Sequence, residues 1–356
     1  MTVPKAQPAS AATQGFLEQL TRYGDQARKV LLDKMPTGEP QAYLYGPMRD
    51  YIETSGKGLR PALLLATCEA FGGKAEDAEI AAAVIELLHN AFLVHDDIED
   101  LSDFRRGREC MHKRLGVPLA INIGDGMQSL ALSLLRQNLG PLGPMTGARV
   151  VDEFDHLLKE SIEGQALELG WIKDNRLDLS PSDYLTMCLK KTCWYSFIHP
   201  MRIGALIARP DDVASGALNL DDFNAFGFFL GAAFQIQDDV LNLVGSQGKY
   251  GKEIGGDIYE GKRTLMLGRL GAQADRQEQS RLSEFLEKPR TARSEQEVEW
   301  VLARMNHYSC IEYAQAAAND LLAAARREFD VVFANTNAAP RAFLGQFMDY
   351  LVARQV

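Results

Sequence analysis

Apolar residues recur at helical spacing along almost the whole chain, and this feature limits its fold more than any other. Val84, Leu87, Leu88, Ala91 and Phe92 follow the i, i+3, i+4, i+7, i+8 pattern that gathers side chains on one helical face. No segment shows the strict alternation with β-branched residues that is typical of a strand. We therefore predict an all-α fold, a single large helical bundle.

Capping signals mark the start of several predicted helices. Ser180 and Asp183 form a capping box around Pro181, and Ser294 with Glu297 repeats the box. The predicted helices cover residues 15–35, 42–55, 58–72, 76–101, 117–139, 143–171, 181–208, 220–244, 262–272, 294–330 and 338–353. No Gly/Ser-rich linker or internal repeat divides them, so we predict a disordered lead-in over residues 1–14 and one domain over residues 15–356.

Charge, cysteine usage and the length of the apolar runs exclude several classes of protein. The formal net charge of −10 makes nucleic acid a poor partner, because it repels the phosphate backbone. The longest apolar run, Ala225 to Phe234, has ten residues, about half of what a membrane span needs. Five cysteines without a CxxC pair fit buried thiols in a reducing cytoplasm. We therefore predict a cytoplasmic protein without a membrane span.

Two clusters of acidic residues stand at the ends of strongly apolar helices. The first contains Asp96, Asp97 and Asp100, of which Asp96 and Asp100 share one helical face. The second contains Asp238 and Asp239. Both lie near predicted helix C-termini, where the helix dipole disfavours negative charge. Locally unfavourable residues tend to mark functional sites, and clustered carboxylates are ligands for Mg²⁺, which usually also binds phosphate.

Basic residues accompany both acidic clusters, several of them in Gly-rich turns where the backbone can approach a ligand closely. They are Lys57, Arg60, Arg105, Arg106, Lys191, Lys252 and Lys262. Carboxylates, Mg²⁺ and cations together are suited to hold a pyrophosphate-like group. The chain has no GxxxxGK[ST] loop and no GxGxxG motif after a strand, so nucleotide-binding folds are not supported.

A phosphate site at the mouth of an apolar helical bundle indicates an amphiphilic diphosphate as ligand. Its tail would lie between the helices and its head at the two acidic clusters. Mg²⁺ and the cations would neutralise a departing pyrophosphate, so that the carbon–oxygen bond can ionise. Apolar walls would shelter the resulting cation from water.

Motifs in a fixed order connect these features between residues 40 and 270. They are GKGLRP at 56–61, HNAFLVHDDIEDLSDFRRG at 89–107, LGVPLAINIGD at 115–125, EGQALEL at 163–169, KT at 191–192, FQIQDDVLN at 234–242 and YGKEIGGDIYEGKRTL at 250–265. The chain thereby resembles the trans-isoprenyl diphosphate synthases, or polyprenyl synthetases, and among them most a geranylgeranyl diphosphate synthase. The resemblance implies an isoprenoid synthase bundle with a central apolar cavity, usually a homodimer. It also implies head-to-tail condensation of isopentenyl diphosphate with an allylic diphosphate (farnesyl or shorter), giving mainly geranylgeranyl diphosphate.

The resemblance further implies a role for each candidate residue. Three Mg²⁺ ions are expected, with Asp96, Asp97 and Asp100 on one side and Asp238, supported by Asp239, on the other. The implied allylic diphosphate ligands are Arg105, Lys191, Lys252 and Lys262, with Thr192 and Gln235 beside the forming cation. The implied isopentenyl diphosphate ligands are Lys57, Arg60, His89 and Arg106.

In this family the residues four and five before the first Asp form the floor of the cavity. Here these are Phe92, which is large, and Ala91, which is small. We therefore expect growth past farnesyl diphosphate that halts near twenty carbons.

Some alternatives stay open at this point. Asn242 stands where many family members have Asp, which leaves the affinity for the third metal undetermined. Trp194 and Tyr195 either pack the core or a dimer interface, or line the cavity and stabilise a cation with their π faces. A terpene cyclase on the same scaffold and a non-catalytic partner subunit are the rival functions. The isopentenyl diphosphate ligands argue against the first, and the five Asp residues argue against the second.

Overall fold

Helices form almost the whole structure, a computed structural model that describes residues 11–54, 56–244 and 255–352. In the first half of the chain they are α1 (Ala11–Lys34), the π-helical η1 (Gln41–Tyr45), α2 (Gly46–Glu53), α3 (Leu59–Ala70), α4 (Ala75–Glu99), α5 (Met111–Leu115), α6 (Val117–Leu142) and α7 (Pro144–Lys173). The next are α8 (Pro181–Cys188), the π-helical η2 (Leu189–Ile198), α9 (His199–Ala208), α10 (Pro210–Ser215) and α11 (Asp222–Val244). The last are α13 (Gly256–Glu260), α14 (Leu265–Gln273), α15 (Arg276–Glu287), the 3-10 helix η3 (Arg290–Ala292), α16 (Glu295–His307), α17 (Cys310–Val332) and α18 (Ala338–Val352). The predicted all-α fold is confirmed.

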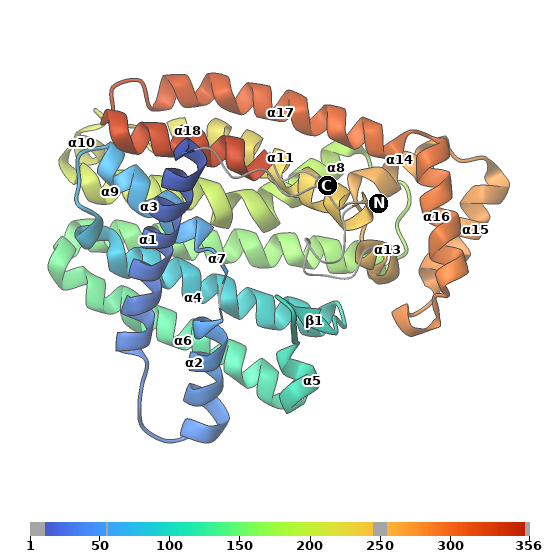
Figure 1. Ribbon diagram of the computed structural model, residues 1–356, viewed down its shortest axis with the longest axis horizontal. Coiled ribbons are helices and arrows are strands. Elements are labelled where there is room, and N and C mark those ends of the chain that lie inside the picture. The colour runs from blue at the N-terminus through green and yellow to red at the C-terminus, as the bar shows by residue number, and fades with distance from the viewer. Residues whose placement is uncertain (1–10, 55, 245–254, 353–356) are drawn as a thin grey trace.

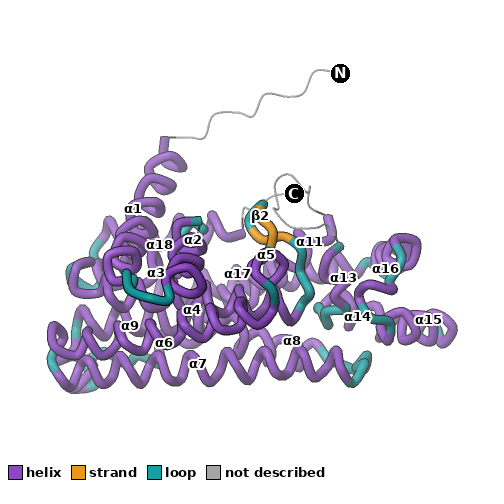
Figure 2. The backbone as a smooth tube through the Cα atoms, turned by 90° about the horizontal axis from the view of Figure 1, so that it is seen from below, coloured by secondary structure: helices purple, strands orange, loops and turns teal. Residues whose placement is uncertain are grey.

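Besides a small cluster that joins η2 to α11, the helices in the described residues pack around two main hydrophobic clusters. The larger cluster surrounds α4, which packs against α1, α3 and α6. The smaller one joins the ends of α8 and α11 to α14, α15, α16 and α17. Leu321 of α17 packs against both clusters, and α17 runs along α11 (Figure 1). A second view shows α7 along one face of the bundle, with α15 and α16 at one end (Figure 2).

The predicted helix over residues 181–208 contains a π-helical segment, η2, between α8 and α9. Two glycines let neighbouring helices approach it closely. A Cβ on Gly164 of α7 would lie 2.3 Å from the backbone nitrogen of Lys191, and one on Gly231 of α11 would lie 2.7 Å from Cys193 Sγ. Segments of π-helix are frequent at functional sites, and this one holds Lys191 and Thr192 between α7 and α11.

Several predicted boundaries are wrong. The expected helix over 294–330 divides into α16 and α17 at Ser309, whose φ is +50°, a left-handed conformation that interrupts a helix. Helix α15 was not predicted, although Asp275 and Glu278 form a capping box at its start. A two-residue antiparallel pair, β1 (Phe104–Arg105) and β2 (Arg108–Glu109), was also not predicted. Residues 11–14 belong to α1 rather than to a lead-in, and residues 1–10 lie outside the described ranges.

One helix in the described ranges, α4, is long and apolar enough to cross a membrane by length and composition. Of its most apolar 18-residue window, 67% is buried inside the fold. Such burial is typical of the core helix of a folded domain, and α4 also ends in the first acidic cluster.

Candidate active site

A cavity of about 620 Å³ opens between the two acidic clusters. Its walls come mainly from α4, α7, η2 and α11, with contributions from α3, α8, α13 and α18 and from the loops before α3, after α4 and before α14. The predicted residues that line it are Lys57, Arg60, His89, Asp96, Asp100, Arg105, Arg106, Lys191, Thr192, Gln235, Asp238, Asp239 and Lys262. Asp97, Ala91 and Phe92 are not part of this lining. Lys252 lies outside the described residues.

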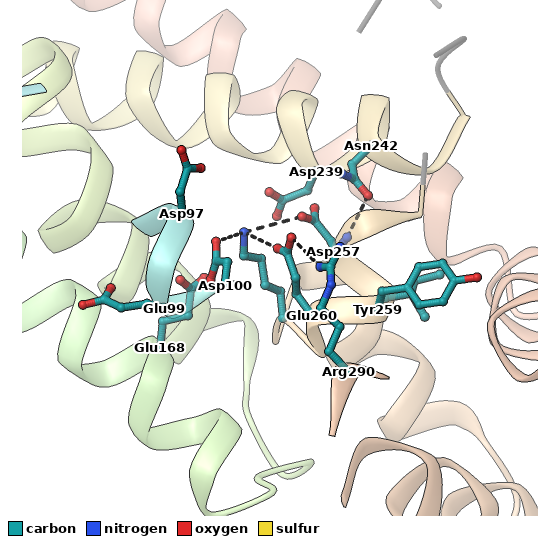
Figure 3. Close-up of polar contacts among 12 residues, drawn as sticks. Asp97, Glu99, Asp100, Glu168, Asp239, Asn242, Asp257, Tyr259, Glu260 and Arg290 are labelled. Carbon is teal, nitrogen blue, oxygen red and sulfur yellow. Dashed lines mark hydrogen bonds and ion pairs between the residues drawn. The ribbon is translucent and has the colours of Figure 1, made fainter. Parts of the chain in front are cut away.

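The α4 wall presents Asp96 and Asp100 to the cavity on one helical face, as their spacing predicts. Burial raises the pKa of Asp96, and neighbouring Lys191 only partly offsets this. Asp97 is 1% exposed and points away from Asp100 (Figure 3). Its Oδ1 accepts a hydrogen bond from Arg105 Nε at 2.8 Å. Asp97 therefore holds Arg105 at the cavity edge, and its role as a metal ligand stays a prediction.

The α11 wall carries a chain of hydrogen bonds that fixes Asp239. The Tyr184 hydroxyl donates to Asp239 Oδ2 at 2.7 Å, and Gln235 Nε2 donates to Oδ1 at 2.8 Å. The Thr192 hydroxyl donates to Gln235 Oε1 at 2.8 Å. Burial raises the pKa of Asp239 to about 7, although the two hydrogen bonds that it accepts act in the opposite direction. Both predicted polar neighbours, Thr192 and Gln235, thus belong to one network with Asp239.

Lys262 joins the two acidic walls. Its Nζ lies 3.0 Å from Asp100, 2.7 Å from Glu260 and 3.7 Å from Asp257 (Figure 3). Burial lowers the pKa of Lys262, but Asp100 and Glu260 outweigh it and the pKa lies well above its usual value. Lys262 is therefore a cation among carboxylates, at the point where the α13–α14 segment meets α4.

Asn242 does not line the cavity. Its Oδ1 accepts a hydrogen bond from the backbone nitrogen of Asp257 at 3.0 Å, and its backbone oxygen accepts one from Gly255 at 2.7 Å. An amide oxygen serves this backbone contact without adding negative charge beside Asp239 and Asp257. The side chain at this position therefore anchors the segment that carries Asp257.

A second group of cations, Lys57, Arg60 and Arg106, lines the other side of the cavity. Arg60 Nη2 donates to the Tyr195 hydroxyl at 2.7 Å, and its guanidinium lies 4.4 Å from the centre of the Tyr195 ring. Lys57 contacts the Tyr350 hydroxyl, and Arg106 lies 3.4 Å from Asn90 Oδ1. In the described part of the chain none of the three forms an ion pair with a carboxylate. This group is therefore suited to bind an anion.

His89 stands between these cations. Burial lowers the pKa of His89 well below its usual value, and the charges of Arg60 and Arg106 lower it further. The imidazole is therefore neutral at physiological pH, and it can hydrogen-bond a ligand without adding a fourth charge.

Sequence reasoning missed several residues that line the cavity. They are Glu86, Glu168, Tyr184, Asp257 and Tyr350. Glu168 pairs with Lys191, and its position within EGQALEL was the only available signal. Burial raises the pKa of Glu86, which lies one turn before His89. Tyr350 belongs to α18, far away in sequence, so no local pattern could associate it with Lys57.

Neither predicted floor residue lines the cavity, and Phe92 contacts a residue that does. Ala91 is fully buried in the larger hydrophobic cluster. Phe92 meets the Tyr195 ring edge-on at 5.5 Å, and Tyr195 itself lines the cavity. Trp194 instead packs against His156 and His199, with ring centres 4.6 and 5.0 Å apart. Of the two open alternatives, Tyr195 takes the cavity position and Trp194 the packing position.

The donor set of the cavity fits a divalent cation. In the residues that the structure describes, no three His, Cys, Asp or Glu groups converge on one point. Mg²⁺ is usually bound by one or two carboxylates together with substrate phosphates rather than by an all-protein cage. Asp96 with Asp100, and Asp238 with Asp239, supply such carboxylate pairs on facing walls.

Fold and cavity together define a helical protein whose central cavity lies between two acidic walls and also carries cations suited to phosphate. A family model for polyprenyl synthetase matches residues 41–305, and the chain belongs to this family. The family uses a divalent metal.

Similar proteins extend the comparison over most of the chain. A geranylgeranyl pyrophosphate synthase of Geoglobus acetivorans is 31% identical over 93% of this chain and 95% of its own length. A geranylgeranyl diphosphate synthase of Sulfolobus acidocaldarius is 38% identical over 63% of this chain and 66% of its own. The crystal structure of a geranylgeranyl pyrophosphate synthetase from Pyrococcus horikoshii superposes with a TM-score of 0.83 at 28% identity, covering 96% of this chain and 99% of that one.

Proposed function

We propose that the protein condenses isopentenyl diphosphate with an allylic diphosphate, farnesyl or shorter, and releases mainly geranylgeranyl diphosphate. The observation that carries this proposal is the presence of two separate cation groups in one cavity. Lys191 and Lys262 form ion pairs with the carboxylates of the acidic walls, whereas Lys57, Arg60 and Arg106 line the cavity without an ion pair among the described residues. Two groups provide for two diphosphates, as a condensation requires. The names of the similar proteins support the twenty-carbon product.

We assign the first diphosphate, the allylic one, to the acidic side of the cavity. Asp96, Asp100, Asp238 and Asp239 would hold Mg²⁺, of which we expect three ions, and Asp97 remains a candidate ligand. When bound, the metal stabilises the negative charge of the leaving pyrophosphate. Lys191 and Lys262 stay protonated, because their pKa values are raised by Glu168 and Asp100 against the effect of burial. They bind the same diphosphate together with Arg105, and the sequence adds Lys252 to this group.

The second diphosphate, that of isopentenyl diphosphate, belongs to Lys57, Arg60 and Arg106, with His89 as a neutral hydrogen-bonding partner. The allylic carbon–oxygen bond breaks and its electron pair leaves with pyrophosphate. The double bond of isopentenyl diphosphate then attacks the allylic carbon, and the released pyrophosphate takes the proton that is lost. Thr192 and Gln235 lie beside the reacting carbons, and Leu93 and Phe234 contribute apolar walls that exclude water.

Chain length is the finer part of the proposal. Ala91 leaves room for growth past fifteen carbons, and Phe92, fixed against Tyr195, stops growth near twenty. We further propose a cytoplasmic homodimer that has no membrane span and does not bind nucleic acid. Exposed apolar side chains on α6 and α7, among them Ile121, Leu132 and Ile162, favour an interface on those helices.

The test is an incubation of the purified protein with Mg²⁺, isopentenyl diphosphate and farnesyl diphosphate. Products are dephosphorylated and identified by mass spectrometry. Geranylgeraniol as the main product supports both the proposed condensation and the proposed chain length. Longer prenols support the condensation but reject the assignment of Ala91 and Phe92 as the floor of the cavity. A cyclic hydrocarbon with isopentenyl diphosphate unconsumed indicates the rival cyclase. Activity that appears only after addition of a second synthase indicates the partner-subunit alternative.

A further inference from the structure

A second cavity, of about 540 Å³, lies behind the catalytic one. The loop over residues 174–180, α14, the start of α15 and Tyr313 of α17 enclose it. Its walls are mainly apolar, with Leu177, Leu179, Leu265 and Leu267 among them. A pocket of this size with apolar walls is suited to a small organic ligand.

Arg263 forms part of the wall between the two cavities and is 4% exposed. Its Nε donates to the backbone oxygen of Arg176 at 3.0 Å, Nη2 donates to Asn175 Oδ1 at 2.7 Å, and Nη1 donates to the backbone oxygen of Gly261. All three acceptors are neutral, and within the described ranges Arg263 forms no ion pair. A guanidinium has five N–H groups, so two remain after these contacts. A buried charge without a counter-ion is costly, and an anionic ligand would lower that cost.

Arg269 contributes a second cation to the cavity. Its guanidinium lies 4.9 Å from the centre of the Tyr313 ring. Its Nε is buried and has no hydrogen-bond partner among the residues that the structure describes. The other lining arginine, Arg176, is already paired with Asp178. The second cavity therefore combines apolar walls with two arginines that lack acidic partners.

We propose that this second cavity binds an isoprenoid phosphate, with the chain along the leucines and the phosphate at Arg269. The charge of Arg263 attracts the anion from the inner wall. The choice of an isoprenoid chain rests on the proposed function, because the substrates and the product of that reaction are isoprenoid diphosphates, which carry the same chain and a phosphate head; the monophosphate serves as a probe of that chemistry. Tyr184 and Thr264 line both cavities, so a ligand in the second cavity contacts residues that also line the catalytic one.

Through these shared residues, a ligand in the second cavity can change the geometry of the catalytic cavity. Tyr184 donates the hydrogen bond that fixes Asp239. Thr264 caps α14 and follows Lys262, which pairs with Asp100. An occupant that shifts either residue moves Asp239 or Lys262 out of the position that the bound allylic diphosphate needs for reaction, so we expect the isoprenoid phosphate to reduce turnover even in the substrate-bound protein.

The test uses geranylgeranyl phosphate as the probe, titrated calorimetrically into the full-length protein in Mg²⁺-free buffer. Two variants perturb the second cavity: Arg269→Gln removes its charge, and Ala272→Trp fills it from an exposed position. Arg281→Gln, which removes a charge that stacks on Trp300 outside both cavities, is the matched control. We expect one probe per chain, with the Kd raised about tenfold or more in both cavity variants and unchanged in the control.

Kinetic and chemical controls complete the experiment. The probe should lower the kcat of the wild type even at saturating farnesyl diphosphate, and this effect should disappear in Ala272→Trp. Geranylgeraniol and inorganic phosphate, used separately, should each bind more weakly than the probe. Equal probe affinity in all variants, or inhibition that farnesyl diphosphate fully relieves, would overturn the proposal. Because the titration needs no turnover, failure of the proposed function appears separately, as wild-type protein that leaves isopentenyl diphosphate unconsumed.

Discussion

The catalytic cavity and a partly buried polar group formed by α7, α9 and the segment before α11 differ in how their charges are balanced. The second group, here the Glu153 cluster, consists of Glu153, His156, His199, Arg202 and Asp221. Glu153 accepts hydrogen bonds from Arg202 at 2.7 and 2.8 Å and lies 2.7 Å from His199 Nδ1. Arg202 also contacts Asp221 at 2.7 Å. Each charge in this cluster faces an opposite charge or a hydrogen-bond partner.

The pKa values of the carboxyl groups express the difference. In the cavity, burial raises the pKa of Glu86 and Asp96, and it raises that of Asp239 to about 7. Burial acts in the same direction on Glu153, but hydrogen bonds from His199 and Arg202 outweigh it and lower its pKa to about 2. The cavity thus holds carboxylates whose charge the protein does not fully balance. Such a site destabilises the fold and favours cationic ligands, whereas the Glu153 cluster stabilises the fold.

The largest effect is expected for Asp96→Asn. Because it removes charge that the divalent metal requires, Mg²⁺-dependent consumption of isopentenyl diphosphate should fall by about 10²- to 10³-fold. The thermal midpoint should stay equal or rise, because a buried, incompletely paired carboxylate is lost. Asp152→Asn, on an exposed position of α7, is the matched control. A wild-type rate in Asp96→Asn would remove Asp96 from the site.

Glu153→Gln should show the reverse behaviour. We expect the free energy of unfolding at pH 7 to fall by about 2–3 kcal/mol, while the specific activity of the folded protein is kept. The pKa of Glu153 is about 2 in the folded state, below its usual value of 4.5. The stabilisation is therefore complete above pH 4.5 and is lost as the pH falls toward 2. Urea titrations at pH 7 and pH 3.5 measure it, and an equal difference between variant and wild type at both pH values would contradict the assignment.

Asp97 shares features of both regions. It is buried and paired with Arg105, like the carboxylate of the Glu153 cluster, but it belongs to the first acidic cluster, and Asp97→Asn tests which feature decides its role. If Asp97 positions Arg105, the KM for farnesyl diphosphate should rise about tenfold, equivalent to the loss of one charged hydrogen bond. The Mg²⁺ concentration needed for half-maximal rate should not change. An increased Mg²⁺ requirement at unchanged KM would instead establish Asp97 as a metal ligand.

The smallest change in rate is expected for Ala91→Phe. Ala91 is fully buried and outside the polar lining of the cavity, so isopentenyl diphosphate consumption with geranyl diphosphate as starter should stay within a few-fold of wild type. The product should shift from geranylgeranyl to farnesyl diphosphate, as measured by mass spectrometry of the dephosphorylated prenols. Ala91→Val serves as a control of smaller volume. Products as long as those of the wild type would show that Ala91 does not set the floor.

The sequence predicted the helical class and most of the cavity because both depend on local spacing. Asp96 and Asp100 share a helical face in any α-helix, and the motifs carry their cations with them. It did not predict that Asp97, which points to another side of α4, meets Arg105, because that partner lies in the short strand β1 after a left-handed residue at Leu101.

Contacts between distant segments account for most of what was missed. Tyr184 reaches Asp239 across 55 residues, and Lys57 reaches Tyr350 across 293. The π-helical η2 depends on close approach by Gly164 and Gly231 of neighbouring helices, which no local propensity encodes. The break at Ser309 likewise interrupts a sequence whose apolar spacing continues through it.

The most direct measurement is a comparison of thermal midpoints with and without Mg²⁺ and inorganic pyrophosphate, for the wild type, Asp96→Asn and Glu153→Gln. Ligands that bind only the folded state raise its stability. If the cavity carboxylates bind a metal–diphosphate complex, adding Mg²⁺ and pyrophosphate should raise the thermal midpoints of the wild type and of Glu153→Gln by the same amount. The thermal midpoint of Asp96→Asn should rise little. An equal gain in Asp96→Asn, or none in the wild type, would contradict the assignment of this cavity as a metal–diphosphate site.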